Sequence, residues 1–312
     1  NHFKIHSQYS ICEGAIKINE LSDHCKTKKI KSIGISDTSN LSGALEFSEN
    51  ISKVGTQPII GTQIIFNFEN NFGLLPIIAK NEIGYKKIIE LSSKSYLEND
   101  SLNEPHCNFN DLLKDPDGII ILSGSVNGLI GKLFDKAKFT EIKQIYKNLK
   151  EKFKDNFYIE IQRHNDENEK SFELFNLNLS KKFEIPIIAS HEVYYLDQSM
   201  YDAHDALMCI GSKTYLNDKN RIKFSNNHYF KSSDQMNEIF SDLPEALQNN
   251  YNLPLRCSFR PVSSKPILPN IGSEKDGGAD QTLINDSLDG LKNKFLNVFK
   301  IRNDDLNLNE KF

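Results

Sequence analysis

The sequence predicts an α/β fold in which a mainly parallel sheet forms a barrel or a doubly wound layer. Seven short apolar runs recur along the chain, and each is followed by a stretch with helical spacing. Strands that alternate with helices are typical of a parallel sheet. Several runs are apolar at consecutive positions, as in PIIA (76–79) and IIIL (119–122), which suits strands buried on both faces. The length of 312 residues allows two ordinary domains or one large barrel with an appendage.

The apolar runs are the predicted strands, because they are short and rich in β-branched or aromatic residues. In chain order they are expected at residues 3–6, 32–36, 58–60, 75–79, 118–123, 157–162 and 185–190. The helices between them are expected at about 15–30, 41–54, 82–95, 128–153, 167–183 and 199–210. After about residue 212 the alternation weakens, and polar loops lead to two short predicted helices near 233–240 and 244–252.

A domain boundary is predicted close to residue 272. The stretch GSEKDGGAD (272–280) is rich in glycine and charge, which is typical of an exposed boundary. Beyond it, Leu and Phe recur at helical spacing, with Asp280 as the predicted N-cap. We therefore predict a first domain over 1–271, and a linker with the first helix of a truncated second domain over 272–312.

Composition and charge exclude several classes of protein. Hydrophobic residues make up 38% and charged residues 26% of the chain, so a sizeable core is expected and general disorder is not. The formal charge is −4, from 38 basic and 42 acidic residues, so this chain alone is not expected to bind nucleic acid strongly. No apolar run approaches the roughly 18 residues of a membrane helix, and a signal-peptide pattern is absent. The five scattered cysteines form no C-x-x-C pair, which indicates reduced thiols and a cytoplasmic location.

Polar residues gather at the ends of the predicted strands. They are His6 and Ser7 after the first strand, Asp37 after the second, Gln63 after the third, Ser123 and Ser125 after the fifth, Arg163 and His164 after the sixth, and His191 and Glu192 after the seventh. In a parallel barrel the carboxyl ends of the strands open on one face, where sites are built. The sequence therefore predicts a shared pocket at that face.

The chain resembles the PHP (polymerase and histidinol phosphatase) domain found at the N-terminus of bacterial replicative DNA polymerase III alpha subunits. The resemblance is carried, in order, by HFKIHSQYSICEG (2–14), IGISDTSNLSGALEF (33–47), QPIIGTQ (57–63), IIAKNEIGYKKI (77–88), GIIILSGSVNG (118–128), FYIEIQRH (157–164), IPIIASHEVYYLDQSMYDAHDALMCI (185–210) and KPILPNI (265–271). Both the order and the spacing of these motifs agree.

The resemblance implies a distorted (β/α)7 barrel of the TIM type, followed by the start of a C-terminal polymerase region. Many relatives hold a trinuclear metal centre of His, Asp, Glu and Cys ligands, and remove nucleotides or phosphates. Hydrolysis of this kind needs clustered cations, which lower the pKa of a bridging water and stabilise the attacking and leaving oxygens. Most of the ligands must therefore be present together.

Most ligand positions of the family carry a different residue in this sequence. Lys4 stands where the first His of the first motif would be, and an ammonium has no lone pair for a metal. The other replacements are Thr38 for His, Gln63 for Glu, Leu74 for His, Ser125 for Cys, and Glu192 and Tyr194 for the last Asp-x-His. The residues that could still attract a cation weakly are His6, Asp37, His164 and Glu192.

The resemblance thus implies a vestigial pocket, with no intact metal centre, no other cofactor and no catalytic residue in this domain. The pocket residues are Lys4, His6, Asp37, Gln63, Ser125, His164, Glu192 and Tyr194. In it we expect the Lys4 ammonium to replace the charge of a lost metal and to donate a hydrogen bond of about 2.7–3.2 Å to Asp37 or Glu192. Arg163 is expected to join the same network of charges.

Two functions from different classes remain open. In the first, the domain is a structural module of the bacterial replicase on which a proofreading exonuclease subunit docks. DNA synthesis then belongs to a Mg²⁺-dependent palm beyond residue 312, and DNA is bound through the full-length subunit, without a membrane partner. In the second, the domain is an active metal-dependent 3′–5′ exonuclease or phosphoesterase. The number of replaced ligands favours the first function.

Overall fold

A computed structural model describes residues 1–99, 104–266 and 278–298. The chain divides into two units, residues 1–262 and residues 263–312. In the second unit the described residues include one helix, α11 (Gly278–Asn297), in the region where the sequence predicts helical spacing. The predicted boundary between residues 271 and 272 lies outside the described residues.

The first unit is built on a nine-stranded sheet whose two edge strands follow each other directly in the sequence. Its strands are β1 (Lys4–Ile5), β2 (Ser32–Thr38), β3 (Gln57–Phe68), β4 (Asn71–Ala79), β5 (Cys107–Asn108), β6 (Ile119–Leu122), β7 (Phe157–Ile161), β8 (Ile187–Ala189) and β9 (Glu192–Val193). The order is β8-β7-β6-β4-β3-β2-β1-β9, with β5 paired to β3. Only Ser190 and His191 separate the two edge strands β8 and β9 in sequence, so the sheet curls into a distorted barrel. The predicted fold class is confirmed.

One strand departs from the parallel pattern. β4 runs antiparallel to both β3 and β6, because β3 continues to Phe68 and turns directly into β4 through Glu69 and Asn70. Both turn residues have positive φ, 49° and 61°, as the twist of a two-residue hairpin requires. The sequence prediction placed strands only at 58–60 and 75–79 here. It missed the long hairpin because the turn carries no Asn-Gly or Asp-Gly signal.

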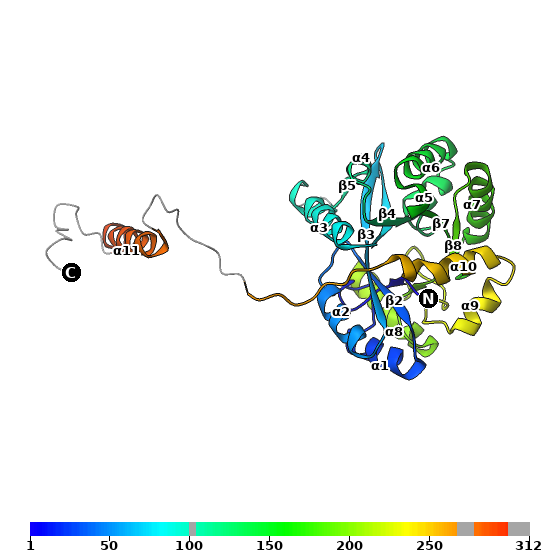
Figure 1. The fold of residues 1–312 in the computed structure, drawn as a ribbon, viewed down its shortest axis with the longest axis horizontal. Coiled ribbons are helices and arrows are strands. Elements are labelled where there is room, and N and C mark those ends of the chain that lie inside the picture. Colours follow the sequence, from blue (N-terminus) through cyan, green and yellow to red (C-terminus); the bar gives the residue numbers. More distant parts are fainter. Residues whose placement is uncertain (100–103, 267–277, 299–312) are drawn as a thin grey trace. The chain divides into compact units, whose positions relative to one another are not determined.

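Helices cover the outside of the sheet (Figure 1). They are α1 (Ile18–Lys28), α2 (Ala44–Lys53), α3 (Glu82–Leu97), α4 (Phe109–Lys114), α5 (Leu129–Asp135), α6 (Phe139–Phe153), α7 (Glu169–Phe183), α8 (Tyr201–Ser212), α9 (Ser233–Ile239) and α10 (Pro244–Asn252). The single helix predicted over 128–153 is two helices, because Ala137 takes a left-handed φ of 53°, which the helix preference of alanine does not predict. No helix in the described ranges combines the length and apolar character of a membrane span.

The strands are buried on both faces, as their consecutive apolar residues predict. In β6, Ile120 and Leu122 pack in a cluster with Phe3 and with residues of β3, β4, β7 and β8. Their neighbours Ile119 and Ile121 pack in another cluster, which includes residues of α5 and α6. Close packing on both faces restricts the movement of the strands. The polar residues in and after them are therefore held in fixed positions.

Candidate functional site

Polar and charged side chains from five strands lie in the buried interior of the first unit. They are Lys4 of β1, Asp37 of β2, Gln63 of β3, Glu160 of β7 and Glu192 of β9. Parallel pairing sets their relative positions, because Lys4 lies opposite Glu192 in the register of β1 and β9. Buried charges are costly unless they are paired, so the partners of each group decide what this cluster can do.

Lys4 supplies a positive charge between two carboxylates. Its Nζ lies 3.4 Å from Glu192 Oε2 and 3.5 Å from Glu160 Oε1, and the side chains of Lys4 and Glu160 are 1% and 0% exposed. Neither contact has hydrogen-bond geometry, and Lys4 Nζ has no hydrogen-bond partner among the described residues. The predicted hydrogen bond of 2.7–3.2 Å is therefore wrong, and a longer ion pair takes its place. Of the two predicted partners, the structure shows Glu192 and not Asp37.

Glu192 is the centre of the cluster. One of its oxygens, Oε1, lies 2.9 Å from His6 Nε2 and accepts a hydrogen bond of 2.6 Å from Gln63 Nε2. Burial by itself would raise the pKa of the Glu192 carboxyl, but the Lys4 charge and the bonds from His6 and Gln63 outweigh it and hold that pKa well below its usual range. Glu192 is therefore ionised at neutral pH and is neutralised by Lys4.

Asp37 is satisfied by hydroxyl and amide groups and not by a cation. Its Oδ1 accepts hydrogen bonds from the Ser7 backbone N–H and from Ser10 Oγ, both at 2.7 Å, and its Oδ2 accepts one from Ser7 Oγ at 2.8 Å. Ser10 Oγ also lies 3.2 Å from His6 Nδ1. Asp37 thus connects to Glu192 through Ser10 and His6. These three bonds explain why the Lys4 ammonium is not needed at Asp37.

His164 is held by hydrogen bonds at both ring nitrogens. The Glu192 backbone N–H donates to His164 Nε2 at 3.1 Å, so Nε2 carries no proton. The proton lies on Nδ1, which is 3.1 Å from Glu169 Oε1. Burial lowers the pKa of the His164 ring, and the neighbouring His228 adds to this effect. His164 is therefore a neutral group that binds the start of β9 to α7.

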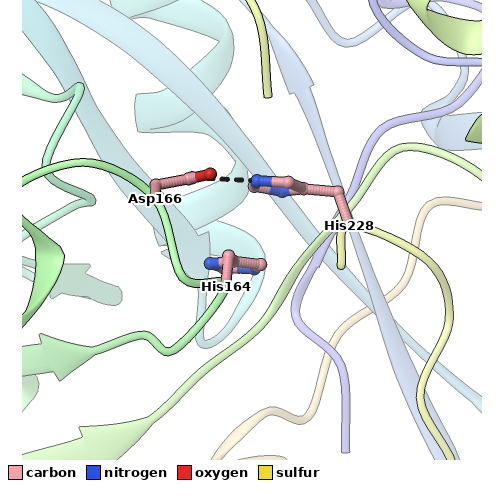
Figure 2. Close-up of side chains that lie close together, drawn as sticks. All are labelled: His164, Asp166 and His228. Atoms are coloured by element: carbon pink, nitrogen blue, oxygen red, sulfur yellow. Dashed lines mark hydrogen bonds and ion pairs between the residues drawn. The ribbon is translucent and has the colours of Figure 1, made fainter. Parts of the chain in front are cut away.

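His164, Asp166 and His228 form a second group of potential ligands (Figure 2). His228 Nε2 lies 2.9 Å from Asp166 Oδ2, and His228 Nδ1 lies 3.2 Å from the Glu192 carbonyl oxygen. Both ring nitrogens therefore face oxygen atoms, and a metal could bind a His228 nitrogen only after one of these contacts is broken. The His164 and His228 rings are stacked, with centroids 4.0 Å apart and planes at 4°.

Neither group of residues, as arranged in this structure, fits the metal centre that the resemblance implies. A metal lies about 2.0–2.1 Å from a histidine nitrogen, along its lone pair, and the lone pairs of two parallel stacked rings cannot converge on one ion. In the Lys4 cluster, the ammonium already lies between the carboxylates that a cation would need. Metal binding in either place therefore requires hydrogen bonds or an ion pair to break first.

The remaining predicted residues lie in different surroundings. Tyr194 stacks on His6 with ring centroids 4.4 Å apart, and burial, followed by the Glu192 charge, raises the pKa of its hydroxyl well above the usual value. Ser125 lines a small cavity beside Glu160, and within the described residues its hydroxyl forms no hydrogen bond with the Lys4 cluster. Arg163 lies outside the predicted charge network, because its guanidinium forms ion pairs of 2.6 Å with Glu173 and Asp242.

Sequence reasoning missed four residues that complete the cluster or its surroundings. They are Glu160, Asp166, Glu169 and His228. Glu160 carried a usable signal, because a carboxylate within the apolar run FYIEI (157–161) is buried in a strand and needs a partner. Asp166, Glu169 and His228 lie in polar loops or at a helix start, where charged residues are common. No local pattern distinguishes them.

The chain is similar in sequence to curated proteins over most of its length. The chain is 35% identical over 300 residues to the DNA polymerase III subunit alpha of Rickettsia bellii, which covers 96% of this chain and 26% of that protein. It is 32% identical over 299 residues to the subunit of the same name from Caulobacter vibrioides, covering 93% and 26%. The chain thus spans about a quarter of the length of these curated relatives.

A solved structure and a family model complete the comparison. A two-domain protein containing a predicted PHP-like metal-dependent phosphoesterase from Bacteroides vulgatus is 13% identical, with a TM-score of 0.40 over 66% of this chain and 55% of that chain. The model of the PHP domain matches residues 2–164, a little more than half of the chain, and this range includes β1 to β7 with Lys4, His6, Asp37 and Gln63. The chain belongs to the PHP domain family.

Proposed function

We propose that the chain is the N-terminal PHP portion of the alpha subunit of a bacterial replicative DNA polymerase. Residues 1–271 form the PHP domain in this proposal, and residues 272–312 begin the polymerase region. Support comes from two relatives named DNA polymerase III subunit alpha, each matched over more than 90% of this chain and about a quarter of the relative. Template-directed DNA synthesis, with its Mg²⁺-dependent palm and its contacts with DNA, belongs to the rest of such a subunit, which acts in the cytoplasm.

Within that subunit we assign the domain a structural role, as the docking module for a proofreading exonuclease subunit. The observation that carries this assignment is the Lys4 ammonium, buried between Glu160 and Glu192. An ammonium in that place neutralises the carboxylates without offering a Lewis acid or a metal-bound water. The cluster then stabilises the fold and supports no hydrolysis.

A manganese-dependent exonuclease assay tests the absence of hydrolysis. The purified chain and its Lys4→His variant are incubated with a 3′-labelled single-stranded oligonucleotide and Mn²⁺. Both should release no nucleotide above the rate of a heat-denatured sample, because Thr38, Gln63 and Tyr194 still leave a metal without its ligands. Turnover by the unmodified chain that persists through further purification and disappears in a His164→Ala variant would overturn the structural assignment.

A binding measurement tests the docking role separately. The chain and the proofreading exonuclease subunit of the same cell are purified and mixed, and their complex is measured by titration calorimetry. Saturable binding at equal stoichiometry, unchanged by Lys4→His, is expected, since Lys4 is buried and cannot contact a partner. Absence of binding at concentrations where the full-length alpha subunit binds would refute the docking role and leave the assay of hydrolysis unaffected.

The active exonuclease or phosphoesterase remains the second candidate. The observation in its favour is the convergence of His164, Asp166 and His228 within one small volume. For activity, the His228 ring would have to leave its stacked position on His164 and give up its bond to Asp166 or to Glu192. A His228→Phe variant separates the two candidates, because it removes this group and leaves the Lys4 cluster in place. Equal and negligible hydrolysis by both proteins supports the structural role.

A further inference from the structure

A large cavity lies away from the Lys4 cluster, on the side of the first unit where β1 and β2 begin. Its volume is about 810 Å³, which lies within the usual range for small-molecule sites. Its walls are formed by the residues that precede β1 and β2, the second half of α1, residues 196–198, residues 229–233 and 235–237, and α10. Asp37 lies near the opposite end of β2 and Gln63 lies in the middle of β3, and no residue of the Lys4 cluster lines this cavity.

The charge of the cavity wall is strongly positive although the chain as a whole is acidic. Four lysines line it: Lys28, Lys29, Lys31 and Lys231. Asp197 is the acidic residue among the described lining residues, and its carboxylate already accepts two bonds from Ser199. None of the four lysines forms an ion pair with a residue in the described ranges. Clustered like charges of this kind favour an anionic ligand.

Lys231 is the most informative of these lysines. It is 4% exposed, and its ammonium lies 3.7 Å from the centroid of the Tyr229 ring. Among the described residues the ammonium forms no hydrogen bond and no ion pair, so the Tyr229 ring is its one specific contact there. A cation–π contact supplies no hydrogen-bond acceptor, and the ammonium of this cavity-lining residue keeps its N–H donors for other partners. A ligand anion in the cavity would supply the missing partner.

His2 provides an independent sign of a ligand. Its Nε2 lies 2.8 Å from the Lys231 carbonyl oxygen, which can only accept, so the proton of the neutral ring lies on Nε2. Burial lowers the pKa of His2 to about 3, so the ring is neutral at pH 7. The remaining nitrogen, Nδ1, is a buried acceptor with no partner in the described part of the chain, and His2 lines the cavity. A hydroxyl or amino group of a ligand would satisfy it.

We propose that this cavity binds a phosphorylated small molecule that also carries a hydroxyl or amino donor. The phosphate contacts Lys231 and the lysines of residues 28–31, and the donor reaches His2 Nδ1. The class includes nucleotides and sugar phosphates. The cavity volume suits such a molecule better than a nucleic-acid strand, which binds along an open, basic groove. This site is distinct from the vestigial metal pocket and does not depend on the proposed role in the replicase.

Titration calorimetry of the full chain tests this site, with ATP as the probe and adenosine and a single-stranded oligonucleotide as comparisons. EDTA is present throughout, so that no metal-bridged binding contributes. We expect saturable binding of ATP, at least tenfold weaker binding of adenosine, and an apparent Kd for ATP that rises with ionic strength. Equal affinity for adenosine, tighter binding of the oligonucleotide than of ATP, or no saturable binding of ATP would each overturn the proposal.

Two variants and a matched control locate the site. Lys231→Met should weaken ATP binding at least tenfold, and a Lys28→Gln, Lys31→Gln double variant at exposed positions should weaken it several-fold without disturbing the fold. Lys152→Gln removes the same charge from an exposed position of α6 that does not line the cavity, and it should bind ATP as the unmodified chain does. If Lys231→Met does not fold, the exposed double variant decides. Unchanged binding by that variant, or an equal loss in Lys152→Gln, would refute the site.

Discussion

Replacing Lys4 by Met removes the charge from the centre of the pocket and keeps most of the side-chain volume. Lys4 is buried between Glu160 and Glu192, so the variant leaves two carboxylates close together with no cation. Removing one partner of a buried pair costs about 3–5 kcal/mol. The carboxylates can escape part of that cost, because one of them can take up a proton.

The free energy needed to protonate one carboxylate sets the expected destabilisation of Lys4→Met and its dependence on pH. A glutamate with an ordinary pKa of about 4.3 must bind a proton about 2.7 units above that value at pH 7, at about 1.36 kcal/mol per unit. Destabilisation is therefore expected to reach about 3–4 kcal/mol at pH 7 and to fall to about 1.6 kcal/mol at pH 5.5. Glu160 is the less supported of the two carboxylates, since its Oε2 has no hydrogen-bond partner in the described ranges, whereas Glu192 keeps its bonds to His6 and Gln63.

Urea unfolding followed by circular dichroism at the two pH values measures this free energy. A Lys4→Met, Glu160→Gln double variant is the matched test, because it removes the surplus carboxylate and should recover most of the loss at pH 7. Lys152→Met, at an exposed position, should change the unfolding free energy by less than about 0.5 kcal/mol. A loss below about 1 kcal/mol for Lys4→Met at pH 7, or the same loss at both pH values, would refute the reasoning.

Three further predictions concern pH, chelation and the Asp37 network. Folding lowers the pKa of His2 from 6.5 to about 3, so the unfolded chain takes up a proton at a higher pH than the folded chain does. The free energy of unfolding therefore falls as the pH drops below about 6.5. Between pH 7 and pH 5, chemical denaturation should show a decrease in this free energy that is about 2 kcal/mol larger for the unmodified chain than for His2→Gln. EDTA should leave the Tm unchanged within about 1 °C in a thermal melt, because an intact metal centre would stabilise the fold through linkage; a drop of many degrees would show that such a centre exists. Ser10→Ala should cost about 1–2 kcal/mol in urea unfolding, since it removes a buried hydrogen bond to Asp37, whereas the exposed Ser171→Ala should cost less than about 0.5 kcal/mol.

Seven of the nine strands could be predicted from the sequence because their physical signal is local, whereas the two-residue strands β5 and β9 could not. A run such as Ile119–Leu122 is apolar at every position, and the structure buries both of its faces in separate clusters. The β3–β4 hairpin could not be predicted in the same way. Its turn depends on positive φ at Glu69 and Asn70, which neither residue requires, so the antiparallel strand is set by tertiary pairing.

The sequence predicts which residues form the candidate site better than it predicts the contacts between them. The positions of Lys4, His6 and Glu192 follow from their places at strand starts and ends. Gln63, expected after the third strand, lies inside the longer strand β3, and the structure still brings these four residues together. The partner of a buried charge depends on distances across the barrel, which no local pattern contains. For that reason Asp37 was a plausible partner of Lys4 in the sequence, although Ser7 and Ser10 satisfy it in the structure.

The Lys4 ammonium neutralises the carboxylates of the pocket in which the resemblance implies a metal centre. Anomalous diffraction from crystals of the chain soaked in Mn²⁺ tests it most directly. We expect Lys4 Nζ to lie between Glu160 and Glu192, with no manganese peak within about 3 Å of His6, Asp37, His164 or Glu192. A manganese ion bound by His6 and Glu192, with the Lys4 side chain displaced from both carboxylates, would contradict it.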